Sequence, residues 1–134
     1  MDQYVSLPRR QTVTVPRGAR VLMVAPERTG AAARETLANI VKACGLRDGD
    51  DCVTAYLRED AMLSIEEAGC SEVVVFGLRP RDVGLAIEAP AYRWTPTLAG
   101  RRYCFAERLS LISEDMARKK RLWSSIKSLK PPTS

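Results

Sequence analysis

The pattern of apolar and polar positions predicts short strands separated by helical segments. The short apolar run within residues 20–25 is typical of a central strand covered on both faces, and residues 72–76 predict a further strand with the clearest signal in the chain. The alternating, β-branched segment at residues 11–15 predicts a half-buried edge strand, and residues 51–57 predict a further strand. Residues 31–44 repeat apolar positions with helical spacing, which predicts a helix. Its apolar stripe comprises Ala33, Leu37, Ile40, Val41 and Cys44.

The second half of the chain gives shorter signals. Ser64 and Glu67 have the spacing of a capping box, which predicts that a short helix begins at residue 64. Residues 80–85 predict a helical turn. Residues 92–98 and 101–105 flank an Ala-Gly pair, and this arrangement predicts a β-hairpin.

A last helix is predicted after residue 113. Ser113 is its predicted N-cap, and the acidic residues that follow suit the positive end of a helix. Two prolines at residues 131–132 end it. The predicted apolar side of this helix comprises Met116, Leu122, Trp123, Ile126 and Leu129.

The order of elements predicts the fold class. Strands that alternate with helices, followed by a hairpin and a terminal helix, indicate an α/β fold. We expect a single three-layer α/β/α domain with a mainly parallel sheet, a short N-terminal arm and a C-terminal helix. The arm is predicted at residues 1–10, the domain at residues 11–130 and a tail at residues 131–134. A length of 134 residues suits one domain.

The composition narrows the possible chemistry. The chain has no histidine, which removes serine–histidine and cysteine–histidine nucleophile pairs and histidine–zinc sites. The cysteines lack the close spacing of zinc ligands, and we interpret them as small buried hydrophobic residues. We therefore expect no catalytic residues, no metal and no cofactor. The cysteines are Cys44, Cys52, Cys70 and Cys104.

Charge and hydropathy indicate the environment. There are 21 basic and 16 acidic residues, which gives a net charge of +5, and the arginines and lysines occur in clusters. Such clusters indicate a nucleic-acid footprint, a solvated surface or a set of contacts for acidic proteins. No apolar run approaches the ~20 residues of a membrane span, and residues 1–10 lack the apolar core of a signal peptide. We expect a cytoplasmic protein without membrane contact.

Two loops and two tryptophans are candidates for binding. In α/β sheets ligands lie beyond the carboxyl ends of the strands, where this chain has the predicted loops 25–30 and 77–81. The first holds a single glycine, which is weak evidence for a phosphate site. The second carries Arg79 and Arg81, which would suit an anion or an acidic partner. Trp123 either packs in the core or is a partly exposed interface anchor, and Trp94 could also be an exposed contact.

Three stretches resemble the psi subunit of the bacterial DNA polymerase III holoenzyme. They are residues 13–25 (VTVPRGARVLMVA), residues 120–126 (KRLWSSI) and residues 3–10 (QYVSLPRR). Psi proteins have a similar alternating strand, proline turn and apolar strand, a terminal helix with Leu-Trp, and an arm with an aromatic residue, leucine, arginines and proline. In this chain Tyr4 stands where tryptophan is usual, the arm is shorter, and Pro8 precedes the arginines.

The resemblance implies a fold similar to that of uracil-DNA glycosylases, without catalysis. It also implies an adaptor whose arm binds the clamp loader and whose domain binds the chi subunit, which contacts single-stranded-DNA-binding protein. If the contacts of the family are transferred to this chain, the clamp loader would be contacted by Tyr4, Leu7, Arg9 and Arg10. Trp123 is the candidate contact for chi.

Two other functions stay open at this point. The clustered arginines also fit a basic nucleic-acid-binding domain related to an inactive glycosylase, which would bind DNA with a steep dependence on salt. An enzyme on a nucleotide-binding α/β fold has only the fold class in its favour, and fold does not imply function.

Overall fold

A computed structural model describes residues 9–16, 18–47, 49–66, 70–98 and 100–129. Its central sheet has four parallel strands in the order β3-β2-β5-β6. Val21 on β2 lies beside Cys52 on β3 and beside Glu72 on β5. The bounds of the strands are β2 Val21–Pro26, β3 Cys52–Leu57, β5 Glu72–Phe76 and β6 Arg102–Ala106. The α/β class and the mainly parallel sheet are as the sequence predicts.

The two middle strands, β2 and β5, are buried on both faces. Successive side chains of a strand point to opposite faces of the sheet, so one run of apolar residues serves two cores. Val21, Met23 and Ala25 on β2 face one apolar cluster, whereas Leu22 and Val24 face the other. The continuous apolar runs of the sequence therefore identify these strands correctly.

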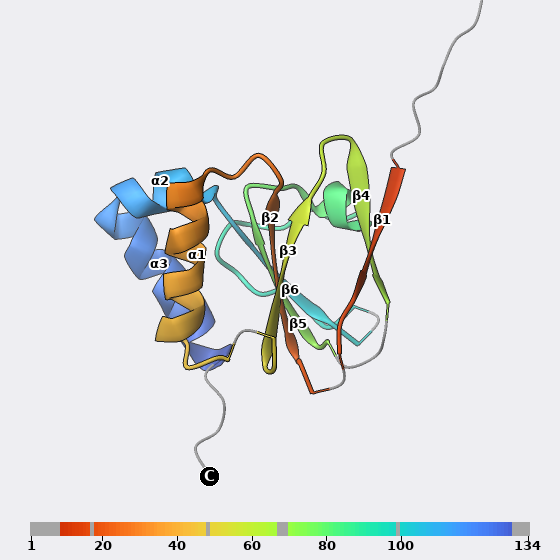
Figure 1. The fold of residues 1–134 in the computed structure, drawn as a ribbon, viewed down its shortest axis with the longest axis horizontal. Helices are drawn as coiled ribbons and strands as arrows, with labels where there is room; N and C mark the ends of the chain where they lie inside the picture. Colours follow the sequence, from red (N-terminus) through yellow and green to blue (C-terminus); the bar gives the residue numbers. More distant parts are fainter. Residues whose placement is uncertain (1–8, 17, 48, 67–69, 99, 130–134) are drawn as a thin grey trace, which may run out of the picture.

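Helices cover one face of the sheet, as Figure 1 shows. They are α1 Ala31–Ala43, α2 Leu109–Glu114, α3 Met116–Ile126 and the 3-10 turn η2 Lys127–Leu129. Helix α1 buries Leu37 and Val41, and Cys44 at its C-cap is buried as well. The helix ends as predicted, because Gly45 takes the left-handed conformation (φ 72°) that glycine adopts without strain.

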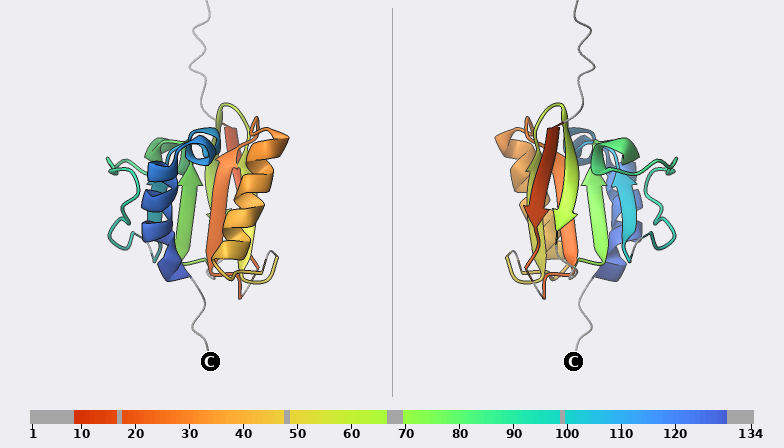
Figure 2. Two further views of the ribbon diagram at one scale, coloured as in Figure 1. Left: turned by 90° about the vertical axis from the view of Figure 1, so that its left-hand side faces the viewer. Right: turned by 90° about the vertical axis from the view of Figure 1, so that its right-hand side faces the viewer.

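A small β-ribbon covers the other face. Strand β1 (Arg9–Thr14) pairs in parallel with β4 (Ala61–Glu66), and the 3-10 turn η1 (Pro80–Val83) packs beside β4 (Figure 2). Leu63 and Val83 contribute buried side chains to this second core. The domain thus has three layers, but the described α-helices all lie on one side, and the third layer is formed by this ribbon and η1.

The prediction that a short helix begins at Ser64 was wrong, because Ser64 lies within strand β4 of the ribbon. Ala61, Leu63 and Ile65 alternate with Met62 and Ser64, and their side chains pack on the sheet. Burial along an alternating strand outweighs a local capping pattern, because an N-cap contributes only about 1 kcal/mol.

Three further boundaries differ from the predictions. Arg9 and Arg10 belong to β1, which runs from Arg9 to Thr14 and not over the predicted residues 11–15. The N-cap of α3 is Asp115, whose carboxylate accepts hydrogen bonds from two backbone N–H groups, and α2 ends at Glu114 just before it. The first arm of the predicted hairpin is not a regular strand: it meets β6 through an isolated bridge from Trp94 to Cys104 and through backbone hydrogen bonds such as that from the N–H of Thr95 to the carbonyl of Tyr103 (2.8 Å). Pro96 supplies no N–H in this arm.

The side chain of Gln11 joins the ribbon to the central sheet. Its carboxamide nitrogen donates to the carbonyl of Tyr56 (2.9 Å), and its carboxamide oxygen accepts from the backbone N–H of Arg58 (2.8 Å). Tyr56 lies in β3, an edge strand of the sheet, and Arg58 directly follows this strand. No helix within the described part of the chain is long and apolar enough to cross a membrane.

Candidate functional site

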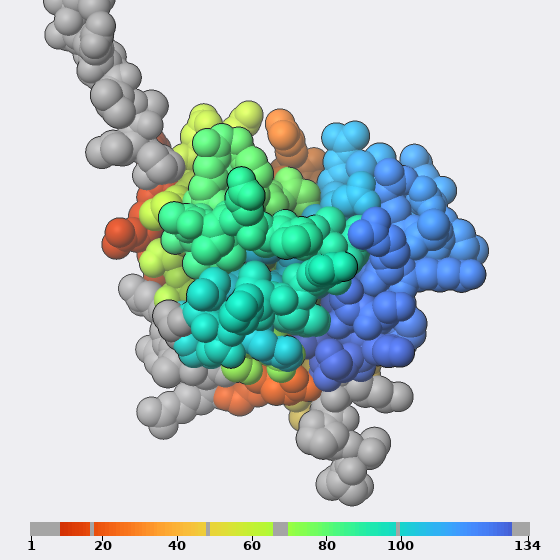
Figure 3. All heavy atoms as spheres, turned by 180° about the vertical axis from the view of Figure 1, so that it is seen from behind, coloured from red at the N-terminus to blue at the C-terminus, as the bar shows by residue number. Residues whose placement is uncertain are grey.

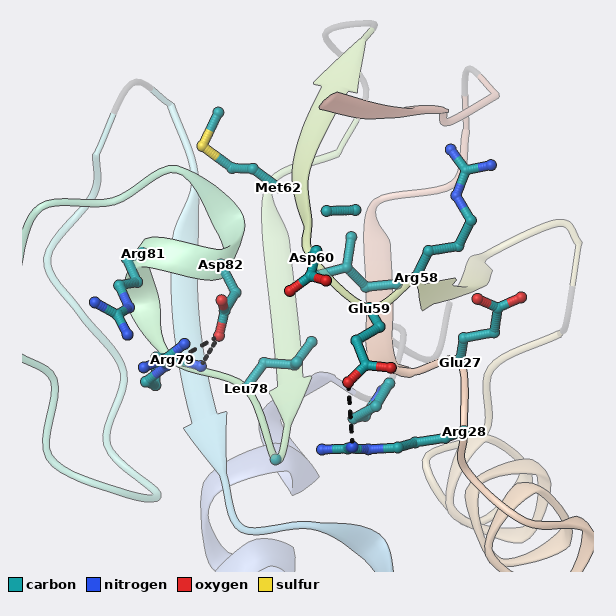
Figure 4. A pocket seen from close by; sticks show the side chains of 14 residues that line it. Glu27, Arg28, Arg58, Glu59, Asp60, Met62, Leu78, Arg79, Arg81 and Asp82 are labelled. Atoms are coloured by element: carbon teal, nitrogen blue, oxygen red, sulfur yellow. Dashed lines mark hydrogen bonds and ion pairs between the residues drawn. The ribbon is translucent and has the colours of Figure 1, made fainter. Parts of the chain in front are cut away.

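A hollow of about 980 Å³ lies beyond the carboxyl ends of β2, β3 and β5 (Figure 4). Its walls come from residues 26–28, 57–62, 77–79 and 81–82. The chain leaves β2 for α1 on the helical face and leaves β5 for η1 on the opposite face, so the hollow lies where the connections diverge. Such a switch point is the usual ligand position in an open α/β sheet. The structure brings the two predicted loops together here.

The hollow is lined by arginines and carboxylates in equal number. Arg28 pairs with Glu59 (3.8 Å), and Arg79 pairs with Asp82 (3.4 Å), as the dashed lines in Figure 4 show. The remaining charged residues are Arg58, Arg81, Glu27 and Asp60. All of these residues except Asp82 are exposed. Water screens exposed charges, so this set suits weak contacts with charged molecules better than activation of a nucleophile.

Arg34 stabilises the loop between β2 and α1, which forms one rim of the hollow. From α1 its guanidinium donates to the carbonyls of Thr29 (3.0 Å) and Glu27 (2.9 Å) and lies 3.9 Å from the centre of the Tyr56 ring. The backbone N–H of Glu27 donates to Leu57 on β3 (2.7 Å). Two backbone carbonyls of the loop between β2 and α1 therefore already accept hydrogen bonds from the guanidinium of Arg34.

Gly77 shapes the opposite rim. It has a left-handed conformation (φ 68°), and a Cβ built there would lie 2.8 Å from the Cβ of Arg108. Its N–H donates to the carbonyl of Ala106 (3.0 Å). A glycine is required because the chain leaving β5 passes directly against the chain entering α2.

The outer face of α3 is the second candidate site. Leu122, Ile126 and Leu129 anchor the helix and its following turn in the core. By contrast, Met116 is 67% exposed and Trp123 is 43% exposed. Trp123 is therefore partly exposed and not a core residue, and its role as an interface anchor stays a prediction, whereas the prediction that Met116 lies on the core side was wrong. Both results follow from the side of α3 that faces the core. That side is centred between Leu122 and Ile126, so the helix is rotated relative to the predicted apolar side.

An ionic network fixes the start of α3. Arg118 donates to both carboxylate oxygens of Glu107 (3.0 Å each) and to Asp115, which caps the helix. Tyr92 donates its hydroxyl to the same Glu107 (3.0 Å). The Arg118 guanidinium lowers the pKa of Glu107, and burial, with the bond to Glu107, raises the pKa of Tyr92 to about 12.

The segment at residues 92–94 fixes the second half of α3. The indole N–H of Trp94 donates to the carbonyl of Ser125 (2.7 Å), and the hydroxyl of Ser125 donates to the carbonyl of Tyr92. The Arg121 guanidinium lies 4.8 Å from the centre of the Tyr92 ring. Trp94 therefore supports the helix from inside, and Figure 3 shows α3 and this region as adjoining parts of one surface.

Of the four predicted clamp-loader contacts, the structure describes two. Tyr4 and Leu7 lie outside the described residues. Arg9 and Arg10 are exposed at the start of β1, where the N–H of Arg9 donates to the carbonyl of Asp60 (3.1 Å) on the rim of the hollow. Trp123 lies on the far side of the sheet from them (Figure 1).

Sequence reasoning missed the third wall of the hollow. Arg58, Glu59 and Asp60 form the turn between β3 and β4, and Asp60 adopts a left-handed conformation (φ 61°). Three consecutive charged residues directly after a predicted strand are the signal that identifies this turn, because they follow a carboxyl end as the other two loops do.

The cysteines take no part in either site. All four are buried, and burial raises the pKa of both Cys44 and Cys104 to about 11. Thiols with such values stay protonated near neutral pH and are poor nucleophiles. Among the described residues there is no group of three or more cysteine or carboxylate side chains that could hold a metal ion.

Comparison of the chain with protein-family models, with curated proteins and with solved structures found no match in any of the three.

Proposed function

We propose that the chain is a non-catalytic adaptor subunit of a replicative DNA polymerase, acting in the cytoplasm. In this proposal it bridges the clamp loader to a chi subunit and, through chi, to single-stranded-DNA-binding protein. The resemblance of residues 13–25 and 120–126 to psi subunits suggests the class of protein. The adaptor role has its main support in the placement of two exposed surfaces on opposite sides of one rigid sheet.

The first surface is the start of β1. Arg9 and Arg10 are exposed there, and residues 1–8, which include Tyr4 and Leu7, directly precede them in the sequence. An aromatic and an aliphatic residue next to two arginines combine an apolar anchor with charge, as protein interfaces commonly do. We assign this end of the chain to the clamp loader.

The second surface is the outer face of α3, with Trp123 at its centre. The central sheet lies between β1 and α3 (Figure 1), so a partner bound at one surface does not cover the other. An adaptor that joins two large partners requires this separation. We assign the α3 face to chi.

Gel-filtration co-elution with the purified clamp loader and chi subunit of the same cell tests the proposal. The full chain should elute in one ternary complex with both partners. A chain lacking residues 1–8, which leaves β1 whole, should lose the clamp loader and keep chi. Failure of the full chain to elute with either partner would contradict the adaptor function.

A basic nucleic-acid-binding domain, related to an inactive glycosylase, is the second candidate. It is favoured by exposed Lys119 and Lys120 beside exposed Trp123, because single strands bind to cations and aromatic rings together. Fluorescence anisotropy with a labelled single-stranded oligonucleotide tests it. Tight binding that weakens steeply with salt would support this function, and its absence at low salt would exclude it.

A further inference from the structure

The outer face of α3 combines exposed apolar side chains with positive charge. Among the described residues the exposed large apolar side chains are Ile87, Met116 and Trp123, and the last two lie on this one helix. Met116, Lys120 and Trp123 are spaced at i, i+4 and i+7, so they form one stripe along the helix. Lys127 at the C-cap continues the stripe at i+11.

The charged side chains that α3 and its C-cap carry all have one sign. Residues 116–127 contain no aspartate or glutamate and five basic side chains. Arg118 is bound to Glu107 and Asp115, and Arg121 stacks on Tyr92. The three lysines, at positions 119, 120 and 127, are exposed, and the ion pairs found within the described residues do not include them.

The face is also held rigidly before any partner binds. Asp115 caps the helix, Arg118 ties its first turn to Glu107, and Ser125 is bonded to both Tyr92 and Trp94. A preformed helix loses little conformational entropy on binding, so its exposed side chains can contribute most of their interaction energy to affinity.

We propose that helix α3 binds with this face in an apolar groove of a partner protein, and that aspartate and glutamate line the rim of that groove. The inference rests on the adaptor function and describes the partner that the folded domain binds. Met116 and Trp123 are seven residues apart, about 10 Å along the helix axis, which matches the anchor spacing of groove-bound helices. The lysines lie around these anchors, where carboxylates on the rim of the groove would meet them.

Binding of the purified chi subunit to the full chain, measured by surface plasmon resonance at several salt concentrations, tests the inference. Trp123→Ala should weaken the affinity at least about tenfold, as expected for a central aromatic anchor, mainly through faster dissociation. The double variant Lys119→Glu, Lys120→Glu should slow association and reduce its salt dependence. Both changes are at exposed positions, and glutamate in the first half of a helix suits its dipole.

A matched control separates local charge from net charge. The double variant Arg58→Glu, Arg81→Glu changes the net charge by the same amount at the hollow, on the carboxyl end of the sheet. It should leave both rates of chi binding close to those of the natural chain. Circular dichroism of each variant verifies that the fold is kept.

The outcomes are distinct. If the full chain does not bind chi, the adaptor function and this inference both fail. If it binds chi and Trp123→Ala binds equally well, the adaptor function stands and the α3 face is refuted. If the two double variants slow association equally, the acidic rim is refuted. Loss of single-stranded DNA binding in the α3 variants, with chi binding unchanged, would overturn the inference in favour of nucleic acid.

Discussion

Replacement of Ile126 by alanine tests which side of α3 faces the core. Ile126 is 0% exposed and belongs to the apolar cluster beneath the helices. The change removes three carbon atoms, which at about 0.8 kcal/mol for each buried group amounts to about 2.4 kcal/mol. The cavity left behind raises the expected loss of unfolding free energy to about 3 kcal/mol, equivalent to a fall in Tm of ~10 °C.

Met116→Ala is the matched control on the same helix. Met116 is 67% exposed, and alanine has a high helix propensity, so we expect a change within about 0.5 kcal/mol. Urea unfolding followed by circular dichroism measures both variants, and an unchanged m-value ensures that the midpoints are comparable. Equal losses for the two variants, or a larger loss for Met116→Ala, would mean that the helix is rotated and would refute the assignment of the α3 face.

Two further predictions concern the rim of the hollow and the ionic network. Gly77→Ala should destabilise the protein by roughly 2 to 4 kcal/mol, because it forces an alanine into a left-handed conformation and brings its Cβ against Arg108. The control Gly49→Ala, at a left-handed position (φ 90°) in open space, should lose only about 1 kcal/mol in the same urea assay. Equal losses for the two variants would exclude the clash. Hydrogen bonds from Arg118 lower the pKa of Glu107 in the folded state, so its contribution to stability is present above the unfolded value of about 4.3 and is lost as the pH falls through the folded pKa. Glu107→Gln should therefore make the stability less dependent on pH in this acidic range, and an unchanged pH profile of Tm would contradict the network.

The central sheet could be predicted from the sequence because its strands carry their own signal. Residues 21–25 and 73–76 are apolar throughout, and a strand buried on both faces is the short element that needs such a run. The predicted helix at residues 31–44 was confirmed for a similar reason, since its apolar stripe and Gly45 agree. Local pattern and tertiary burial point to the same structure at these positions.

The β-ribbon could not be predicted, because its partners are distant in sequence. Arg9 pairs with Ala61 in the register of β1 and β4, and nothing near either residue indicates the other. Ser64 carries a helical capping pattern that the strand overrides. The face of α3 was also misjudged, because Asp115 replaces Ser113 as the N-cap and because apolar residues occupy both sides of this helix.

The candidate sites were predictable to different degrees. The loops at residues 25–30 and 77–81 were expected at the carboxyl ends of strands, and both line the hollow. The turn at residues 58–60 was missed because the strand after it was read as a helix. Whether Trp123 is buried depends on the rotation of α3, which only the packing of Leu122 and Ile126 decides.

The carboxamide of Gln11 has a consequence for the solubility of the protein. It presents one N–H to Tyr56 at the end of β3 and one carbonyl to Arg58 just after it, as a peptide group of a neighbouring strand would. An exposed edge strand is a template on which a strand of another molecule can add, and proteins guard such edges against aggregation. One side chain thus occupies, within the molecule, hydrogen-bonding positions that a foreign strand would otherwise use to start a fibre.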